Sequence, residues 1–158
     1  MTLWSTQLGK IVLTFLISMV PVVELRGAIP VGVAHGLDLW TAVAVSVAGN
    51  LLPVPFVILF SRRLFAWLRR KIPKLGGAIS RLEQRAKRKS KMVRQFSFFG
   101  LVLLVAIPLP GTGAWTGALV AAILNMRLKR AFPAIALGVA IAAILVGAAS
   151  HGVGALIA

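Results

Sequence analysis

The stretch IPLPGTGAW at residues 107–115 interrupts an apolar region that runs from residue 96 to residue 126. Proline removes a backbone donor and glycine favours turns, so one helix is not expected to continue through it. The apolar pieces on either side, 96–109 and 114–126, are shorter than the ~20 residues that a helix needs to cross a bilayer. The sequence therefore predicts a re-entrant hairpin that enters the membrane, turns and returns.

A second interruption, ELRGAIP at residues 24–30, divides the apolar region 8–37. Broken backbone at membrane depth is tolerated only where it is buried in protein or lines a cavity. Both interruptions therefore indicate a site. Two interpretations of residues 8–37 stay open: a second re-entrant hairpin, or a helix that crosses once, which Lys10 slightly favours.

Residues 40–60 and 131–157 are long, nearly uncharged stretches and predict two transmembrane helices. The whole chain of 158 residues is 59% hydrophobic and 13% charged, far from the composition of a soluble domain. It contains no cysteine, which excludes disulfides, thiolate metal sites and cysteine nucleophiles. These features predict an all-α integral membrane protein.

Positive charge is concentrated in the middle of the chain. There are 18 basic and 3 acidic residues, a net charge of +15, and 13 of the basic residues lie between Arg62 and Arg94. Because basic loops stay on the cytoplasmic side, we expect residues 61–95 and 127–130 to be cytoplasmic, in a multi-pass protein of the cell inner membrane. Anionic lipid headgroups are the expected partners of this loop. Nucleic acid is not expected, because the basic block lies between apolar stretches.

Both basic clusters can be cytoplasmic only if residues 96–126 enter the membrane and return. The predicted fold is therefore an inverted repeat, in which a re-entrant helical hairpin is followed by a transmembrane helix in each half. The halves are residues 1–60 and 96–158, and a basic amphipathic cytoplasmic hairpin at 61–95 joins them. Two spans and two hairpins are few to enclose a cavity, so a homodimer is expected.

Glu24 and Arg26 are ionisable residues at membrane depth, which are costly there and usually functional. Two positions apart on a helix they would diverge, so either each has its own partner or the backbone unwinds near Gly27 and Pro30. Asn50 lies midway along its predicted span. Its buried amide needs a partner, in a structural or a functional role.

New helices are expected to begin at residues 113–115 and after Pro30, and helix N-termini attract anions. Thr112 is a candidate N-cap. With Arg26 nearby, these features predict a site for a phosphate or carboxylate, and Glu24 becomes a candidate proton-coupling or charge-balancing group. No metal, cofactor or catalytic group is expected. The candidate substrate-binding residues are Glu24, Arg26, Gly27, Pro30, Asn50, Pro108, Pro110, Gly111, Thr112, Gly113 and Trp115.

Three strings, ELRGAIP (24–30), GNLLP (49–53) and PLPGTGAWTG (108–117), resemble the small multi-drug export protein family over roughly residues 15–150. The resemblance implies efflux. More distantly, the proline-glycine loop with a membrane arginine is similar to the DedA superfamily, some of whose members are implicated in recycling polyprenyl-phosphate lipid carriers. Thr112 stands where DedA-like loops place an acidic residue, and the acid of this chain is at Glu24 instead.

The sequence thus favours a membrane transporter, not an enzyme, with a midplane site for an anionic substrate such as a lipid phosphate or an organic anion. Two alternatives stay open. One is an exporter of cationic or amphipathic drugs. The other is a membrane scaffold that recruits a partner or anionic lipid through the basic loop.

Overall fold

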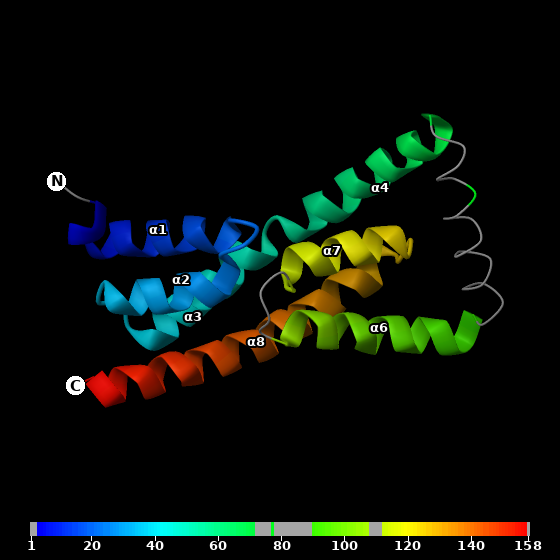
Figure 1. Cartoon of the computed structure of the whole chain (residues 1–158). Helices are drawn as coiled ribbons and strands as arrows, with labels where there is room; N and C mark the ends of the chain where they lie inside the picture. The colour runs from blue at the N-terminus through cyan, green and yellow to red at the C-terminus, as the bar shows by residue number, and fades with distance from the viewer. Residues whose placement is uncertain (1–2, 72–76, 78–89, 108–111, 158) are drawn as a thin grey trace.

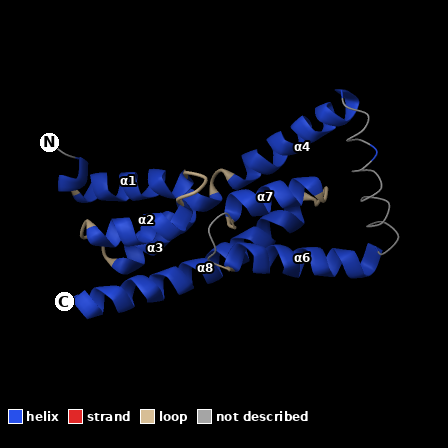
Figure 2. Ribbon diagram, in the orientation of Figure 1, coloured by secondary structure: helices blue, strands red, loops and turns tan. Residues whose placement is uncertain are grey.

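The computed structural model describes residues 3–71, 77, 90–107 and 112–157, and every regular element in this part is helical (Figure 2). The prediction of an all-α protein is confirmed. The elements are η1 (Leu3–Ser5), α1 (Gln7–Met19), α2 (Glu24–Ala34), α3 (Leu39–Leu51), α4 (Val54–Lys71), α6 (Ser90–Ala106), α7 (Ala114–Ile123) and α8 (Leu128–Ile157).

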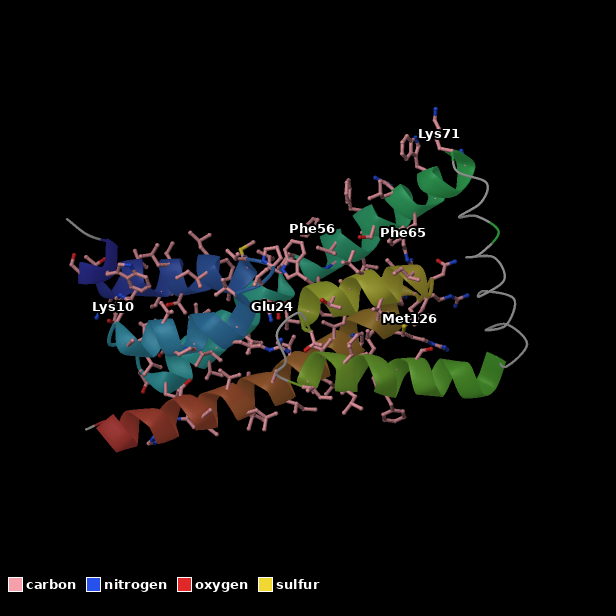
Figure 3. The ribbon with its side chains drawn as sticks, in the orientation of Figure 1. Lys10, Glu24, Phe56, Phe65, Lys71 and Met126 are labelled. Carbon is pink, nitrogen blue, oxygen red and sulfur yellow. The ribbon has the colours of Figure 1, made fainter. Side chains whose placement is uncertain are left out.

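Two helical hairpins approach each other from opposite ends of the molecule (Figure 1). In the first, α1 runs toward the middle and α2 returns beside it, joined by a turn at residues 20–23. In the second, α6 runs toward the middle from the other end and α7 returns, while the residues 108–111 between them lie outside the described part. The tips of the two hairpins therefore meet near the centre, where Glu24 is labelled in Figure 3.

The first break in the chain precedes the position that the sequence suggested. Helix α2 begins at Glu24 and continues through Pro30, so the prediction that a new helix opens after Pro30 is wrong. The turn forms instead around Pro21, because a proline forces the preceding residue out of the helical region. Val20 accordingly has extended dihedrals, φ −70° and ψ 128°, and ends α1.

Two longer paths run the length of the molecule. Helix α3 is followed directly by α4, with the break at Leu52 and Pro53. Helix α8 runs from beside α6 and α7 to the end of the molecule where α1, α2 and α3 lie (Figure 1). Within the described residues, Leu39–Trp67 and Leu128–Gly152 are long and apolar enough to cross a membrane. Much of their surface is apolar and exposed, as lipid-facing surface would be; Phe60 and Ile144 are examples.

The basic ends of the described helices lie together. Lys71 at the end of α4 and Met126 in the turn before α8 are at one end of the molecule, and Lys10 is at the other (Figure 3). Arg127 lies in the same turn as Met126, and Lys129 and Arg130 lie in the first turn of α8. The middle of the predicted basic hairpin at 61–95, residues 72–76 and 78–89, falls outside the described residues, and its flanks belong to α4 and α6.

Small residues let the helices approach closely, as is usual in membrane proteins. Gly138 of α8 faces α6, and a Cβ atom there would lie 2.8 Å from the Val102 carbonyl oxygen and 2.6 Å from Val105 Cβ. Gly49 of α3 faces α1, where a Cβ atom would lie 2.6 Å from the Phe15 carbonyl oxygen. These two glycines fix the distance between the hairpins and the long helices.

The close contact at Gly138 predicts that two glycine-to-alanine substitutions differ in their effect on stability. One position faces α6 and the other lies within α6. Gly138→Ala is expected to lower the free energy of unfolding by about 1–3 kcal/mol, because the added methyl group overpacks the α6–α8 contact. The control is Gly100→Ala in α6, where a Cβ atom would meet nothing within 4 Å. That change should be neutral, or stabilising by up to about 1 kcal/mol through helix propensity. Thermal unfolding in detergent, followed by circular dichroism, would contradict this packing if both variants behaved alike.

Candidate functional site

Arg26 of α2 holds the chain where α6 ends. Its guanidinium donates hydrogen bonds to the carbonyl oxygens of Ile107 (2.9 Å) and Val105 (3.3 Å). It also donates to the Thr112 carbonyl oxygen and lies 3.4 Å from Thr112 Oγ1. The last carbonyls of a helix lack intrahelical partners and carry partial negative charge. The arginine therefore caps the C-terminal end of α6 with a full positive charge.

The side chain of Glu24, two residues earlier in α2, lies against the first residues of α7. Its Oε1 accepts a hydrogen bond from the Trp115 amide (3.3 Å), and the carboxylate also interacts with the Ala114 amide. Gly113 packs directly against the carboxylate, so a Cβ atom at that position would collide with it. Glu24 is only 6% exposed. The N-cap role at α7 is thus performed by a side chain from another helix.

Thr112 is not the N-cap of α7, contrary to the prediction. Gly113 holds that position, and no side chain within the segment caps the helix. The Thr112 hydroxyl donates instead to the Ile107 carbonyl oxygen (2.8 Å), across the gap between α6 and α7. The predicted helix start at residues 113–115 is confirmed, since α7 begins at Ala114.

The two charges of α2 are matched to the two broken helix ends. Glu24 meets the amide end of α7 and Arg26 meets the carbonyl end of α6, so each has its own partner, as their spacing along a helix requires. A third bond joins the tips: the Trp115 indole Nε1 donates to the Met19 carbonyl oxygen at the end of α1 (3.2 Å). We call this set of contacts the tip junction. It joins both hairpins through backbone groups that have no partner within their own helix, because the helix ends there.

The backbone at Glu24 is unusual. Its φ is 50°, and among the described non-glycine residues it shares a positive φ only with Asn125. Asparagine tolerates this conformation, whereas other side chains adopt it rarely and at a cost of about 1–3 kcal/mol. The surrounding contacts must offset that cost. The residue with this conformation directly follows the turn at 20–23, and its carboxylate meets residues 113–115.

The other predicted site residues fall into three groups. Gly27 and Pro30 lie on α2 without a described contact to the tip junction: a Cβ atom at Gly27 would meet only Val23, and Pro30 is exposed. Asn50 is buried, 1% exposed, and its Oδ1 has no hydrogen-bond partner among the described residues. Pro108, Pro110 and Gly111 lie outside the described residues.

Sequence reasoning did not identify two parts of this region. The backbone oxygens of Met19, Val105 and Ile107 bind the tip residues, and carbonyl groups have no signature in a sequence. The buried hydroxyls of Thr14, Ser18 and Ser46 were also missed. A usable signal existed for these, because Thr14 and Ser18, like Ser46 and Asn50, are four residues apart and so share a helix face.

Comparison with known proteins identifies a family. The model of a family described as "Putative small multi-drug export protein" matches residues 24–145. No curated protein and no solved structure gave a significant match. The matched region begins at Glu24 and includes every described residue of the tip junction except Met19.

The guanidinium geometry predicts that Arg26→Lys will destabilise the protein although it conserves charge. A lysine ammonium has no planar fork and cannot reach carbonyls on both sides of the break. We expect a loss of about 2–3 kcal/mol, the scale of hydrogen bonds to a charged group. The matched control is Arg63→Lys, at an exposed position of α4, which should unfold like the wild type. Equal midpoints for the two variants in thermal unfolding would contradict the capping role.

The contact between Gly113 and the carboxylate predicts that a shorter acid will rescue a larger neighbour. Gly113→Ala should destabilise the protein by about 1–3 kcal/mol, because the methyl group occupies the space of the Glu24 carboxylate. Adding Glu24→Asp, which withdraws the carboxylate by one methylene, should restore part of the loss. Unfolding midpoints of both single variants and the double variant measure the coupling. Simple additivity would show that the two residues do not meet.

Proposed function

The chain belongs to the putative small multi-drug export protein family, and from that premise we propose that it is a small multi-pass transporter whose substrate site is the tip junction. We further propose that both hairpins are re-entrant and enter the bilayer from opposite faces. The repeated order supports this: α1 and α2 precede the long α3–α4 path, and α6 and α7 precede the long α8. Each hairpin with its following helix is then one half of an inverted repeat.

The observation that carries the proposal is the position of the Glu24 carboxylate at the amide end of α7, with Arg26 two residues away. A helix N-terminus with free amides binds carboxylates and phosphates alike. A substrate anion of similar size can bind the same amides once Glu24 leaves them. We therefore propose an anionic substrate, a lipid phosphate or an organic anion, that alternates with the carboxylate of Glu24.

This alternation would couple transport to protons. When Glu24 leaves the amides of α7, its carboxylate loses the bonds that stabilise its charge in apolar surroundings. It takes up a proton, while the substrate anion supplies the negative charge beside Arg26. The site then keeps the same net charge before and after the exchange. One proton would move for each anion bound.

The positive charge at one end of the molecule is compatible with an anionic substrate. Lys71 of α4 lies at the same end of the molecule as Met126, which is followed by Arg127, Lys129 and Arg130 at the start of α8. By the positive-inside rule this end would face the cytoplasm in the cell inner membrane. Clustered positive charge raises the local concentration of anions, including lipid headgroups. We propose that this end, together with the basic residues 61–95, binds anionic lipid and collects the substrate. A homodimer would complete the enclosure of the site.

Two other functions have support of their own. The family description names multi-drug export, and the buried Glu24 carboxylate could neutralise a cationic drug. The high positive charge of residues 61–95 is compatible with a scaffold that recruits a partner or anionic lipid. The following assay separates the three.

Purified protein in proteoliposomes with an imposed pH gradient should move anions. The probes are inorganic phosphate, benzoate and a short-chain fluorescent phosphatidic acid, with ethidium as the cation. Arg26→Ala should reduce anion transport about tenfold or more, because it removes the positive charge of the site. Glu24→Gln should keep anion exchange but lose its dependence on the pH gradient, since glutamine resembles the protonated acid. Arg63→Ala, at an exposed position of α4, is the matched control.

Transport of ethidium that survives Arg26→Ala and is lost in Glu24→Gln would replace the anion proposal with cation export. The absence of transport for every probe, together with loss of binding to anionic vesicles on deletion of residues 78–93, would favour the scaffold.

A further inference from the structure

Four buried polar side chains lie on α1 and α3, two on each helix, and we call this set the polar stripe: Thr14, Ser18, Ser46 and Asn50. Each is at most 1% exposed. The Ser18 hydroxyl donates to the Phe15 carbonyl oxygen (2.7 Å). Thr14 Oγ1, Ser46 Oγ and Asn50 Oδ1 have no hydrogen-bond partner among the described residues.

Helix register places these side chains opposite one another. Thr14 and Ser18 are one turn apart on α1, and Ser46 and Asn50 are one turn apart on α3. Gly49 of α3 packs against Phe15 and Ser18, so the faces that carry the polar groups are the faces in contact. Because α1 and α3 run in the same direction (Figure 1), one turn back along each helix brings Thr14 to the level of Ser46.

Helix α2 closes the stripe on a third side. A Cβ atom at Gly32 would lie 2.9 Å from Thr14 Oγ1, so α2 passes directly over that hydroxyl. The Thr14 hydroxyl therefore lies between α1 and α2, and all four side chains of the stripe are buried within the protein. Enclosure by protein is the condition under which polar groups and water persist at membrane depth.

Oxygens of this kind are rarely left dry. A hydroxyl in an apolar helix commonly bonds a carbonyl one turn earlier, as Ser18 does, but Thr14 and Ser46 do not. A buried polar group without a partner costs about 1–3 kcal/mol, and such groups normally hold ordered water. Two hydroxyls that can donate and accept, followed by an amide oxygen that accepts, are suited to a chain of water molecules.

The inner end of the stripe reaches the tip junction. Ser18 precedes Met19, whose carbonyl accepts the Trp115 indole, and the amide of the same tryptophan donates to Glu24. Asn50 lies at the inner end of α3, next to the end of α2 where Glu24 begins. The outer end points toward the turn between α2 and α3, the end of the molecule where Lys10 lies (Figure 3).

We propose that the polar stripe is a water-filled path that connects Glu24 with the aqueous phase on the side of the α2–α3 turn. It is the route by which protons reach and leave that carboxylate, and this use of the path rests on the proposed coupling of transport to protons. Arg26 is the charged side chain beside Glu24. Helix α1 contributes only Lys10, at its far end, and α3 and α7 contain no charged residue.

Silver-ion labelling tests the hydration of the stripe. The chain has no cysteine of its own, so a single introduced thiol is the only one that reacts. Thr14→Cys and Ser46→Cys place single thiols in the stripe, and Ala142→Cys places one in the apolar core midway along α8, where the alanine is 1% exposed. Ag+ is small and reacts with the thiolate, which forms only where water is present. Both stripe thiols should react about tenfold or more faster than the core thiol, measured as loss of later maleimide labelling in detergent.

Two outcomes of this labelling would overturn the path. One is a Ser46→Cys rate no higher than that of Ala142→Cys. The other is protection of the stripe thiols by Na+ but not by K+ or choline, since a bound cation would then occupy the place assigned to water.

The proton route has its own readout, which needs no substrate. Once the pH is lowered far enough to protonate Glu24, its carboxyl has an infrared band, identified by its disappearance in Glu24→Gln, and the exchange of this proton in deuterium oxide can be timed. Thr14→Val with Ser46→Ala should slow this exchange about fivefold or more, because the hydroxyls that order the water are gone. Thr14→Ser keeps a hydroxyl and should exchange like the wild type.

An unchanged exchange rate in the double variant, with the stripe thiols still reactive, would show that the water does not serve Glu24. Because neither measurement involves transport, a failure of the proposed transport function would be seen separately, in the proteoliposome assay.

Discussion

The structure depends on one reciprocal interaction: two opposite charges of α2 cap the two helix ends created by the break between α6 and α7. Arg26 bonds the carbonyl end and Glu24 the amide end. In a membrane, no water is available to solvate these charges or the unpaired backbone groups at the broken helix ends. The bonds between them lower the free-energy cost of burying both. This mutual dependence explains why a glutamate with positive φ is retained at the start of α2.

The sequence predicted the all-helical class and the helix start at residues 113–115, because strong local signals carry them. Pro108 to Gly113 cannot continue a helix, and the spacing of Glu24 and Arg26 requires separate partners. The position of the first turn was not predicted, because Pro21 and Pro30 give the same local signal. Helix α2 tolerates Pro30 on its exposed side, and the chain turns at Pro21. The partners of Arg26 were beyond prediction, since they are backbone oxygens brought together only by the fold.

The groups that the sequence predicts to bind an anion are already bonded within the protein. An arginine and a helix start near each other look, in sequence, like an empty site for an anion. In the fold, the arginine already bonds carbonyl oxygens and the helix start already holds a carboxylate. Under the proposed function, a substrate would have to compete with these groups of the protein, and specificity would come from displacing Glu24.

The capping across the two halves also has a consequence for how the chain is made. Arg26 bonds Thr112, 86 residues later, so both charges of α2 are synthesised long before their partners. At about 5–20 residues per second, that interval lasts roughly 4–17 s. During it, the first hairpin carries uncompensated charges and resists burial in lipid. The early half would wait at the bilayer surface or inside the insertion machinery, and the arrival of the second break would release it.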